Sequence, residues 1–391
     1  MTEKRTWQKS HPWISFRLDF SSMPADIWLL AGEIASKCEH VAGAPLLQDT
    51  ANELMQVYLS KGAQATTAIE GNTLTEAEVR RQIEGTLNLP KSKEYLGFEI
   101  DNIVAACNDV LKQAASPAPP LLTPRRIMEF NAAVLRKLAL DEHVQPGKYR
   151  EYSVGVADYR GAPHNAIRQL VGELCTWLNQ PWLSGFPSLS PRDLRRLDAV
   201  FKAIVAHLYI AWIHPFGDGN GRTARLVEFS ILVNTGVPFP SAHLLSNHYN
   251  QTRSEYYRQL SKASKSGGDV RSFCLYAMRG FADQLREQID VIQSLQRKLF
   301  WQAQIAAKLP DSATGRRQRN LVEDLPDDPA GLTKRQVVDI SPRVARAYAK
   351  LDEKTLSRDL DALEKLGLVE RVEGRYRAKM EIVLGYRPTG K

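Results

Sequence analysis

Apolar residues recur at helical spacing through the first three quarters of the chain. In residues 92–115 they fall three or four positions apart and form one face, made of Leu96, Ile100, Ile103, Val104, Cys107, Val110 and Leu111. A longer helix is expected from residue 191 towards residue 213, with an apolar face of Leu194, Leu197, Phe201, Ile204, Val205 and Leu208. Another continues after Arg222 until Gly236. The pattern therefore predicts a mainly α-helical fold.

Several predicted helices have clear start and stop residues. Residues 53–71 are expected to form a helix that Gly71 stops, because glycine favours the position after a helix end. Thr75 and Glu78 have the spacing of a capping box, which begins a helix. Thr123 followed by Pro124 is typical of an N-cap and a first helical position.

Two stretches interrupt the helical pattern. The stretch PGKYREYSVGVADYRGAPH, residues 146–164, has the Tyr, Val and Gly content of a short β-hairpin. Residues 309–331 are polar, charged and proline-bearing, which predicts a linker.

Residues 332–391 have a pattern of their own. Two short helices are followed by a third whose apolar seam is Leu356, Leu360, Leu363 and Leu366. The stretch GLVERVEGRYRAK then alternates like two strands around Gly374. This order of elements predicts a small winged helix-turn-helix domain.

Length and composition limit the class of protein. A chain of 391 residues is too long for one ordinary core, so two or three domains are expected. No apolar run has the length of a membrane span, and the charged N-terminus lacks the apolar core of a secretory signal. The four cysteines are too scattered for a zinc site and do not require disulfides. We therefore expect a cytoplasmic protein without membrane contact, whose net charge of +8 favours polyanionic partners.

The stretch HPFGDGNGR, residues 214–222, lies where one predicted helix ends and the next begins. A helix N-terminus offers unpaired N–H groups and the positive end of the helix dipole. Gly219 and Gly221 let the backbone curl so that these donors converge on one anion. Arg222 and Arg225 share a face of the first turn. Together these groups would hold a polyphosphate, although arginines taken singly are more often surface residues paired with acids.

Two further residues of this stretch suggest chemistry. The Asp218 carboxylate would repel phosphates unless a divalent cation lay between them, and Mg²⁺ prefers one or two carboxylates with phosphate oxygens and water. His214 can take a proton from a hydroxyl nucleophile when its imidazole is neutral. The alternative for His214 is a buried structural histidine, which we expect of His207. Phe216 is expected to anchor the loop in the core.

The full stretch HPFGDGNGRTAR, residues 214–225, resembles the signature of the Fic (filamentation induced by cyclic AMP) domain family. The resemblance covers about residues 60–300. Fic proteins of this kind transfer AMP from ATP to a hydroxyl side chain of a target protein, and their fold is a helical bundle with a β-hairpin flap. The resemblance implies that His214 is the general base and that Asp218 holds the Mg²⁺ bridging the α- and β-phosphates.

The resemblance also implies which residues hold the phosphates. Asn220, with the backbone of Gly219 and Gly221, would form the anion hole. Arg222 and Arg225 would contact the β- and γ-phosphates.

A second stretch, TTAIEGN at residues 66–72, resembles the family's inhibitory motif. Thr66, Glu70 and Gly71 occupy the places of its Ser or Thr, its Glu, and its Gly or Asn. The arrangement is similar to that of class II members, in which an inhibitory helix, here about 53–71, precedes the catalytic motif in the same chain. The resemblance implies that Glu70 pairs with Arg225 and removes the partner of the γ-phosphate. Taken alone, Glu70 would be a surface carboxylate at a helix end.

The predicted hairpin resembles the flap that aligns target backbone by strand addition. The flap residues implied are Lys148, Tyr149, Arg150, Val154 and Val156. A plain hairpin would have the same pattern, and neither Lys148 nor Arg150 then needs a partner.

The C-terminal domain is a candidate for DNA binding. It carries 14 Lys or Arg against 9 Asp or Glu. The candidate DNA contacts are Lys354, Thr355 and Arg358 at the start of the expected recognition helix, and Arg375 in the wing. Winged helices also bind proteins, and the carboxylates Asp359, Asp361 and Glu364 would repel phosphates on one face.

The sequence thus predicts a mainly α fold, a Fic-type helical bundle with a β-hairpin flap and a small C-terminal winged-helix domain. The expected parts are an N-terminal helical region with the inhibitory helix at 1–115, a Fic catalytic core at 116–308, a linker at 309–331 and a winged helix-turn-helix at 332–391.

The predicted function is a protein adenylyltransferase (AMPylator) that uses ATP and Mg²⁺ and is autoinhibited through Glu70 and Arg225. Two alternatives stay open: a DNA-binding regulator with a nucleotide-sensing Fic domain, and a Fic-type deAMPylase. The expected partners are an unidentified target protein, the chain itself through self-modification or a homodimer, and DNA through the C-terminal domain. No membrane partner is expected.

Overall fold

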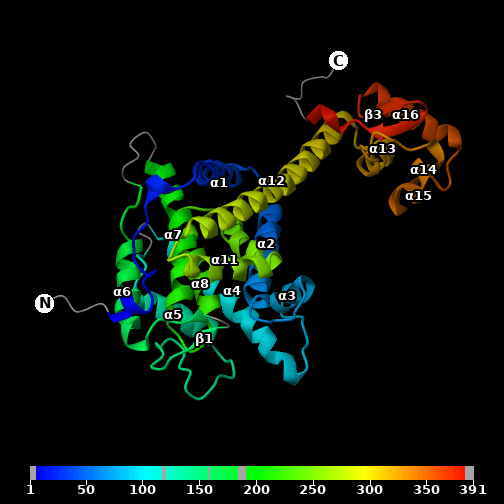
Figure 1. Ribbon diagram of the computed structural model, residues 1–391. Coiled ribbons are helices and arrows are strands. Elements are labelled where there is room, and N and C mark those ends of the chain that lie inside the picture. The colour runs from blue at the N-terminus through cyan, green and yellow to red at the C-terminus, as the bar shows by residue number, and fades with distance from the viewer. Residues whose placement is uncertain (1–5, 117–119, 157–158, 184–190, 384–391) are drawn as a thin grey trace. The chain divides into compact units, whose positions relative to one another are not determined.

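The computed structural model describes residues 6–116, 120–156, 159–183 and 191–383. In these ranges the chain is mainly α-helical, with two short antiparallel hairpins (Figure 1). It divides into two compact units, Met1–Ile289 and Asp290–Lys391. No helix in the described ranges is long and apolar enough to cross a membrane. The prediction of a mainly helical fold with a β-hairpin is confirmed.

The first unit holds one large helical core. Its helices are α1 (Ala25–Gly43), α2 (Gln48–Ala68), α3 (Glu76–Ile83), α4 (Glu94–Ala114), α5 (Pro124–Val134), α6 (Ile167–Leu178), α7 (Pro191–Ile213), α8 (Asn220–Asn234), α9 (Phe239–Ala242), α10 (Leu244–Gln251) and α11 (Arg253–Lys265). Helix α12 (Arg271–Lys308) begins in this unit and continues past its boundary at Ile289. Strands β1 (Gly155–Val156) and β2 (Tyr159–Arg160) pair antiparallel, with Val156 opposite Tyr159.

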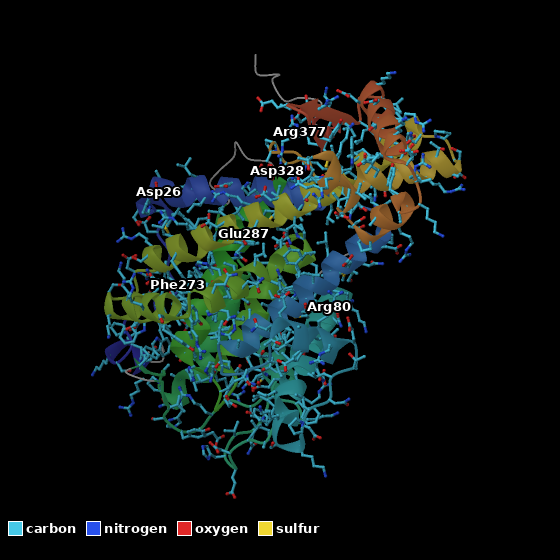
Figure 2. The ribbon with its side chains drawn as sticks, turned by 90° about the vertical axis from the view of Figure 1, so that its right-hand side faces the viewer. Asp26, Arg80, Phe273, Glu287, Asp328 and Arg377 are labelled. Carbon is cyan, nitrogen blue, oxygen red and sulfur yellow. The ribbon has the colours of Figure 1, made fainter. Side chains whose placement is uncertain are left out.

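Helices α7 and α8 form the centre of this unit (Figure 1). The predicted apolar face of α7 is buried, since Phe201, Ile204 and Leu208 have no exposed surface. Helix α8 is buried on almost every side because α2, α4, α5 and α7 all pack against it. Phe273 of α12, labelled in Figure 2, is fully buried in the same core. The end of α7 and the start of α8 are therefore held by rigid surroundings.

Two of the predicted helix starts agree with the structure, whereas the helix predicted from residue 53 begins at Gln48. Thr75 and Glu78 form both hydrogen bonds of a capping box at α3. Thr123 caps α5 by accepting a hydrogen bond from the Arg126 N–H, with Pro124 at the first position. Helix α8 starts at Asn220, a little earlier than the sequence pattern indicates.

The inhibitory stretch is not helical to its end. Helix α2 runs from Gln48 to Ala68, and Glu70 lies in the turn that follows. Gly71 adopts a φ of +103°, which favours glycine and ends the helical path. The carboxylate of Glu70 therefore projects from a turn rather than from a helix face.

The first hairpin is shorter than the pattern at 146–164 predicts. Strand pairing is limited to residues 155–156 and 159–160, and the tip at 157–158 lies outside the described residues. Lys148, Tyr149, Arg150 and Val154 precede the strands, and Val156 lies in β1.

The second unit contains helices and a hairpin around a smaller core. Its elements after α12 are α13 (Ala313–Asp324), α14 (Lys334–Val338), α15 (Pro342–Tyr348), α16 (Glu353–Lys365), β3 (Val369–Val372) and β4 (Arg375–Ala378). The predicted seam residues Leu356, Leu360 and Leu363 are buried in it, whereas Leu366 is 37% exposed. The elements follow the expected order, and the assignment as a winged helix-turn-helix stays a prediction. Residues 384–391 of that predicted domain lie outside the described residues.

Residues 309–331 differ from the prediction of a linker, because they include α13. Ser312 caps this helix by accepting a hydrogen bond from the Gly315 N–H. Leu321 and Val322 are fully buried in the second core. Because α13 has so few apolar residues within a charged segment, the sequence shows little helical periodicity there.

A buried carboxylate joins three helices of the second unit. Asp359 of α16 is 4% exposed and accepts hydrogen bonds from Arg317 Nε at 2.7 Å, Gln318 Nε2 at 2.9 Å and Tyr348 Oη at 2.8 Å. These donors lie on α13 and α15. Because α13 supplies two of them, it is part of the folded unit.

Replacing Asp359 with alanine is expected to destabilise the second unit by about 1.5–3 kcal/mol, because Arg317, Gln318 and Tyr348 lose the buried carboxylate that accepts their hydrogen bonds. Calorimetric unfolding of the full chain should show the second unit melting earlier. The exposed neighbour Asp361 provides the matched control, Asp361→Ala. Equal effects of the two substitutions would contradict the structural role of Asp359.

Candidate active site

The turn between α7 and α8 is closed by one side-chain amide. Asn220 Oδ1 accepts from the Phe216 N–H and Asn220 Nδ2 donates to the Phe216 carbonyl, both at 2.9 Å. Phe216 is 1% exposed and packs in the core, as expected. Gly219 has a φ of +74°, which makes the sharp entry into α8. The Asn220 side chain is thus committed to the turn, and its backbone N–H remains for an anion.

The start of α8 presents several unpaired donors. Thr223 makes the first intrahelical hydrogen bond, to the Gly219 carbonyl at 2.8 Å. The N–H groups of Asn220, Gly221 and Arg222 consequently have no acceptor within the helix. The positive end of the helix dipole lies at the same place. This geometry suits a phosphate group.

Asn131 of α5 holds the turn from behind. This side chain has no exposed surface, and its Nδ2 donates to the Asp218 carbonyl at 2.9 Å. Its Oδ1 accepts from the Gly147 N–H at 2.9 Å, which ties the segment before the hairpin to the same amide. Sequence reasoning missed Asn131, because a single amide on an amphipathic helix gives no local signal.

Replacing Asn131 with alanine is expected to lower the free energy of unfolding by about 1–3 kcal/mol, because buried backbone groups lose their partners. Thermal unfolding of the full chain measures the change. Asn165→Ala removes an exposed amide and provides the control. An unchanged melting temperature in Asn131→Ala would show that the amide does not hold the turn.

His214 lies at the end of α7 with a neutral imidazole. Burial, and after it the nearby Arg150 guanidinium, lower the pKa of His214 to about 4, against weaker opposite effects of the Ala211 backbone, Glu70 and Asp218. At neutral pH the ring can therefore accept a proton. His207 differs, as expected: it has no exposed surface and contacts Glu228 and Tyr256 in the core.

Asp218 presents its carboxylate beside the start of α8. Its side chain is 47% exposed, and its Oδ1 accepts from the Gly219 N–H at 2.5 Å. Across the described residues, no group of three or more His, Cys, Asp or Glu side chains could hold a metal ion. A cation at Asp218 would therefore take most of its ligands from phosphates and water.

Arg222 forms an ion pair with Glu99, a residue that the sequence analysis did not single out. Its Nη1 donates to Glu99 Oε1 of α4 at 2.7 Å, and its Nη2 lies 3.5 Å from Asp218. Glu99 Oε2 accepts from Asn72 Nδ2 at 2.8 Å, and burial raises the pKa of Glu99 despite the nearby Arg222. Glu99 thus orients Arg222 from a helix distant in sequence.

Arg225 and Glu70 form an ion pair. Arg225 Nη2 donates to Glu70 Oε1 at 2.5 Å and to the Thr66 carbonyl at 2.9 Å. The Arg225 side chain is 1% exposed, and its Nε and Nη1 are buried without partners. Burial raises the pKa of Glu70, but Arg225 outweighs this effect and leaves the pKa below its ordinary value. Thr66 takes part through its backbone carbonyl.

Gly221 leaves room for this ion pair. A Cβ at Gly221 would lie 2.2 Å from Glu70 Oε1 and 3.2 Å from Arg225 Nη1. The turn that carries Glu70 is also held from α11, where Arg253 Nη2 donates to the Ile69 carbonyl at 2.5 Å and Tyr257 Oη donates to it at 3.3 Å. No local pattern in the sequence indicates these α11 contacts.

The segment before the hairpin packs against the turn. The Tyr149 ring lies 5.6 Å from the Phe216 ring, centroid to centroid. Arg150 is 4% exposed, which corrects the expectation that it needs no partner: its guanidinium donates to several backbone carbonyls. Lys148 and Val154 lie in the same irregular segment, where Lys148 is exposed and Val154 is partly buried.

The candidate DNA contacts lie in the second unit. Lys354 and Arg358 are exposed in the first turns of α16, with Thr355 partly buried between them. Arg375 instead donates to the carbonyls of Ala330 and Gly331, at 2.6 and 3.0 Å. Its guanidinium is therefore occupied within the unit.

The first unit thus places a helix N-terminus with unpaired N–H groups beside His214, whose pKa burial lowers. The Fic/DOC family profile matches residues 121–232 of the chain, the part that carries this turn.

Known proteins are similar over a wider range. The chain is 28% identical over 214 residues to protein adenylyltransferase fic-1 of Caenorhabditis briggsae, covering 55% of this chain and 38% of that protein. It is 30% identical over 220 residues to protein adenylyltransferase Fic of Nematostella vectensis, covering 54% and 44%. The matches thus span roughly two fifths of the length of these relatives.

Solved structures support the fold. A Fic family protein from Desulfovibrio desulfuricans G20 superposes with a TM-score of 0.55 at 20% identity, covering 91% of this chain and 97% of that one. Fic-1 (residues 134–508) from C. elegans superposes with a TM-score of 0.56 at 23% identity, covering 68% and 73%.

Proposed function

We propose that this chain is a protein adenylyltransferase, which transfers AMP from ATP to a hydroxyl side chain of a target protein. The observation that carries the proposal is the position of His214, whose pKa is lowered by burial, at the same turn as the unpaired donors of α8. Asp218, Arg222 and Arg225 surround these donors. Relatives named protein adenylyltransferase, matched over half of this chain, support the same reaction.

The proposed reaction is a displacement at the α-phosphorus of ATP, in which each residue of the site has a separate role. The target oxygen forms a bond to the α-phosphorus, and the bond to the bridging oxygen breaks so that pyrophosphate leaves with the electron pair. His214 accepts the proton of the target hydroxyl. The N–H groups at the start of α8 stabilise charge on the phosphate oxygens without having to reorganise. Bound Mg²⁺, next to Asp218, would neutralise charge on the phosphates.

Arg225 is the residue through which Glu70 inhibits the reaction. A γ-phosphate would supply acceptors for the buried Nε and Nη1 of Arg225, which lack partners. Glu70 already occupies its Nη2, and the carboxylate repels a phosphate at the same place. Nucleotide that binds while this pair persists is therefore held in an unproductive position.

The identity of the transferred group tests the reaction. The Glu70→Gly variant is incubated with cell lysate, Mg²⁺ and ATP labelled at either the α- or the γ-phosphate. Protein should become labelled from α-labelled ATP alone, and a chelator should prevent the labelling. Labelling from γ-labelled ATP would indicate a phosphotransferase, and release of AMP from pre-modified protein without any transfer would favour a deAMPylase.

A second candidate role is DNA binding by the second unit. The exposed Lys354 and Arg358 at the start of α16 favour this role. Filter binding of duplex DNA over a salt series measures it, and Lys354→Ala with Arg358→Ala should reduce the steepness of the salt dependence. Unchanged binding in this double variant would remove α16 from the interface.

A further inference from the structure

Arg150 is a buried cation whose hydrogen bonds go to neutral carbonyls. Its Nε donates to the His214 carbonyl at 2.7 Å, its Nη1 to Tyr152 at 2.5 Å and its Nη2 to Ala162 at 2.5 Å. Nη2 also lies 3.4 Å from the Ile213 carbonyl. Hydrogen bonds from a charged donor are stronger than neutral ones. One side chain therefore joins the end of α7 to both sides of the hairpin.

The last carbonyl groups of α7 receive no hydrogen bond from an N–H within the helix, so other donors must satisfy them. The Arg150 guanidinium donates to the His214 carbonyl, and the Arg150 backbone N–H donates to the Pro215 carbonyl at 3.0 Å. Tyr159 Oη of β2 donates to the Trp212 carbonyl at 2.7 Å. Arg150 and Tyr159 thus bind the carbonyls of four successive residues, 212–215, on both sides of the imidazole.

His214 has a backbone conformation that requires such support. Its φ is +48°, in the left-handed region that is costly for a residue with a Cβ. The hydrogen bond from Arg150 Nε orients the peptide plane directly after this residue. Loss of that bond would let the backbone relax and displace the imidazole.

Gly161 shows how closely the hairpin approaches this arrangement. A Cβ at Gly161 would lie 3.0 Å from Arg150 Nη2 and 3.0 Å from His214 Cβ. Gly161 also donates to the Val154 carbonyl at 3.1 Å. Small displacements of the hairpin are therefore transmitted to Arg150 and His214.

The charge of Arg150 acts on the imidazole as well. Burial is the main reason that the pKa of His214 is low, and Arg150 is the second. The other charged groups that face the ring are Glu70 and Asp218, and both raise its pKa. Arg150 therefore favours the neutral ring that a base requires.

We propose that Arg150 is a positioning residue, which fixes the backbone of His214 and couples the hairpin to the histidine. The inference rests on the proposed function, because it gives Arg150 a role in the proton transfer to His214. It does not place Arg150 in contact with ATP.

Kinetics of Arg150→Met test the positioning role, measured in the Glu70→Gly background. The kcat for AMP transfer should fall about 100-fold, the cost of misplacing a reacting group by about 1 Å. The KM for ATP should change less than about twofold, since the phosphate donors lie on α8. Arg150→Lys keeps the charge and some hydrogen bonds, so it should recover part of kcat. Arg168→Met, at an exposed arginine, is the control.

A merely structural role for Arg150 would give other results. Activity would then fall in proportion to the folded fraction, measured by circular dichroism, with kcat per folded molecule unchanged. If Arg150→Met does not fold, Gly161→Ala replaces it, because its added Cβ displaces Arg150 and His214 without removing a hydrogen-bonding group. A normal kcat in folded Gly161→Ala would overturn the proposal.

Titration of His214 by NMR provides a readout that needs no transfer activity. In Arg150→Met the pKa of His214 should rise from about 4, because the cation that disfavours imidazolium is gone. An unchanged pKa together with an unchanged kcat would overturn the inference. If Glu70→Gly alone shows no transfer, the proposed function fails, and the titration still decides whether Arg150 acts on His214.

Discussion

The Glu70→Gly variant is expected to incorporate AMP about 10- to 100-fold faster than the wild-type chain. A hydrogen bond between charged groups contributes about 1.5–3 kcal/mol, which corresponds to that range of rates. The variant loses the carboxylate that holds Arg225 Nη2. Arg225 then becomes free for the γ-phosphate. Incorporation of α-labelled AMP into lysate protein, at equal enzyme and ATP concentrations, measures the difference.

The control separates loss of the carboxylate from loosening of the turn. Ala68→Gly adds a glycine at the end of α2 but retains Glu70. Its rate should stay near that of the wild type. Equal activation of Ala68→Gly and Glu70→Gly would show that backbone freedom, rather than the ion pair, determines the activity.

His214→Ala in the Glu70→Gly background is expected to lower the transfer rate about 100- to 10,000-fold, the usual contribution of a general base. Affinity for ATP should change little, because the donors on α8 and the two arginines remain in place. Transfer is measured with α-labelled ATP, and binding by calorimetry with the same nucleotide.

The exposed histidine His164 provides the matched control, and His164→Ala should leave both quantities unchanged. Loss of ATP binding in His214→Ala would instead mean that the imidazole maintains the shape of the site. Transfer at the parent rate would remove His214 from the proton transfer.

The sequence predicted the parts of the site that are encoded locally. The apolar faces of α4 and α7, the caps at Thr75 and Thr123, and the turn at 214–222 each depend on residues close together in the chain. The resemblance of residues 66–72 to an inhibitory motif also indicated that Glu70 and Arg225 would meet, although 155 positions separate them. That expectation came from the family resemblance, since spacing alone cannot bring two such residues together.

The supporting residues were not predictable, because their roles arise from contacts between distant elements. Asn131 reaches Asp218 across 87 positions, and Arg222 reaches Glu99 across 123. Arg150 illustrates the reason most clearly. Arginine in a hairpin is usually solvated, but here the folded chain brings carbonyls from the end of α7 and from both sides of the hairpin to one guanidinium.

The hairpin and α13 were misjudged for a related reason. Composition at 146–164 favoured strands, but hydrogen bonds from Gly147 to Asn131 and from Arg150 to Pro215 hold most of that segment in an irregular path. Charge at 309–331 favoured a linker, but burial of Leu321 and Val322 stabilises a helix there. In both segments tertiary contacts outweighed local preference.

A crystal structure of the Glu70→Gly/His214→Ala variant with ATP and Mg²⁺ tests the central claim most directly, since this variant binds substrate without consuming it. We expect a triphosphate over the start of α8, with the γ-phosphate on Arg225, the cation beside Asp218 and the α-phosphate next to residue 214. Nucleotide bound elsewhere, or a triphosphate that contacts neither α8 nor Arg225, would contradict it.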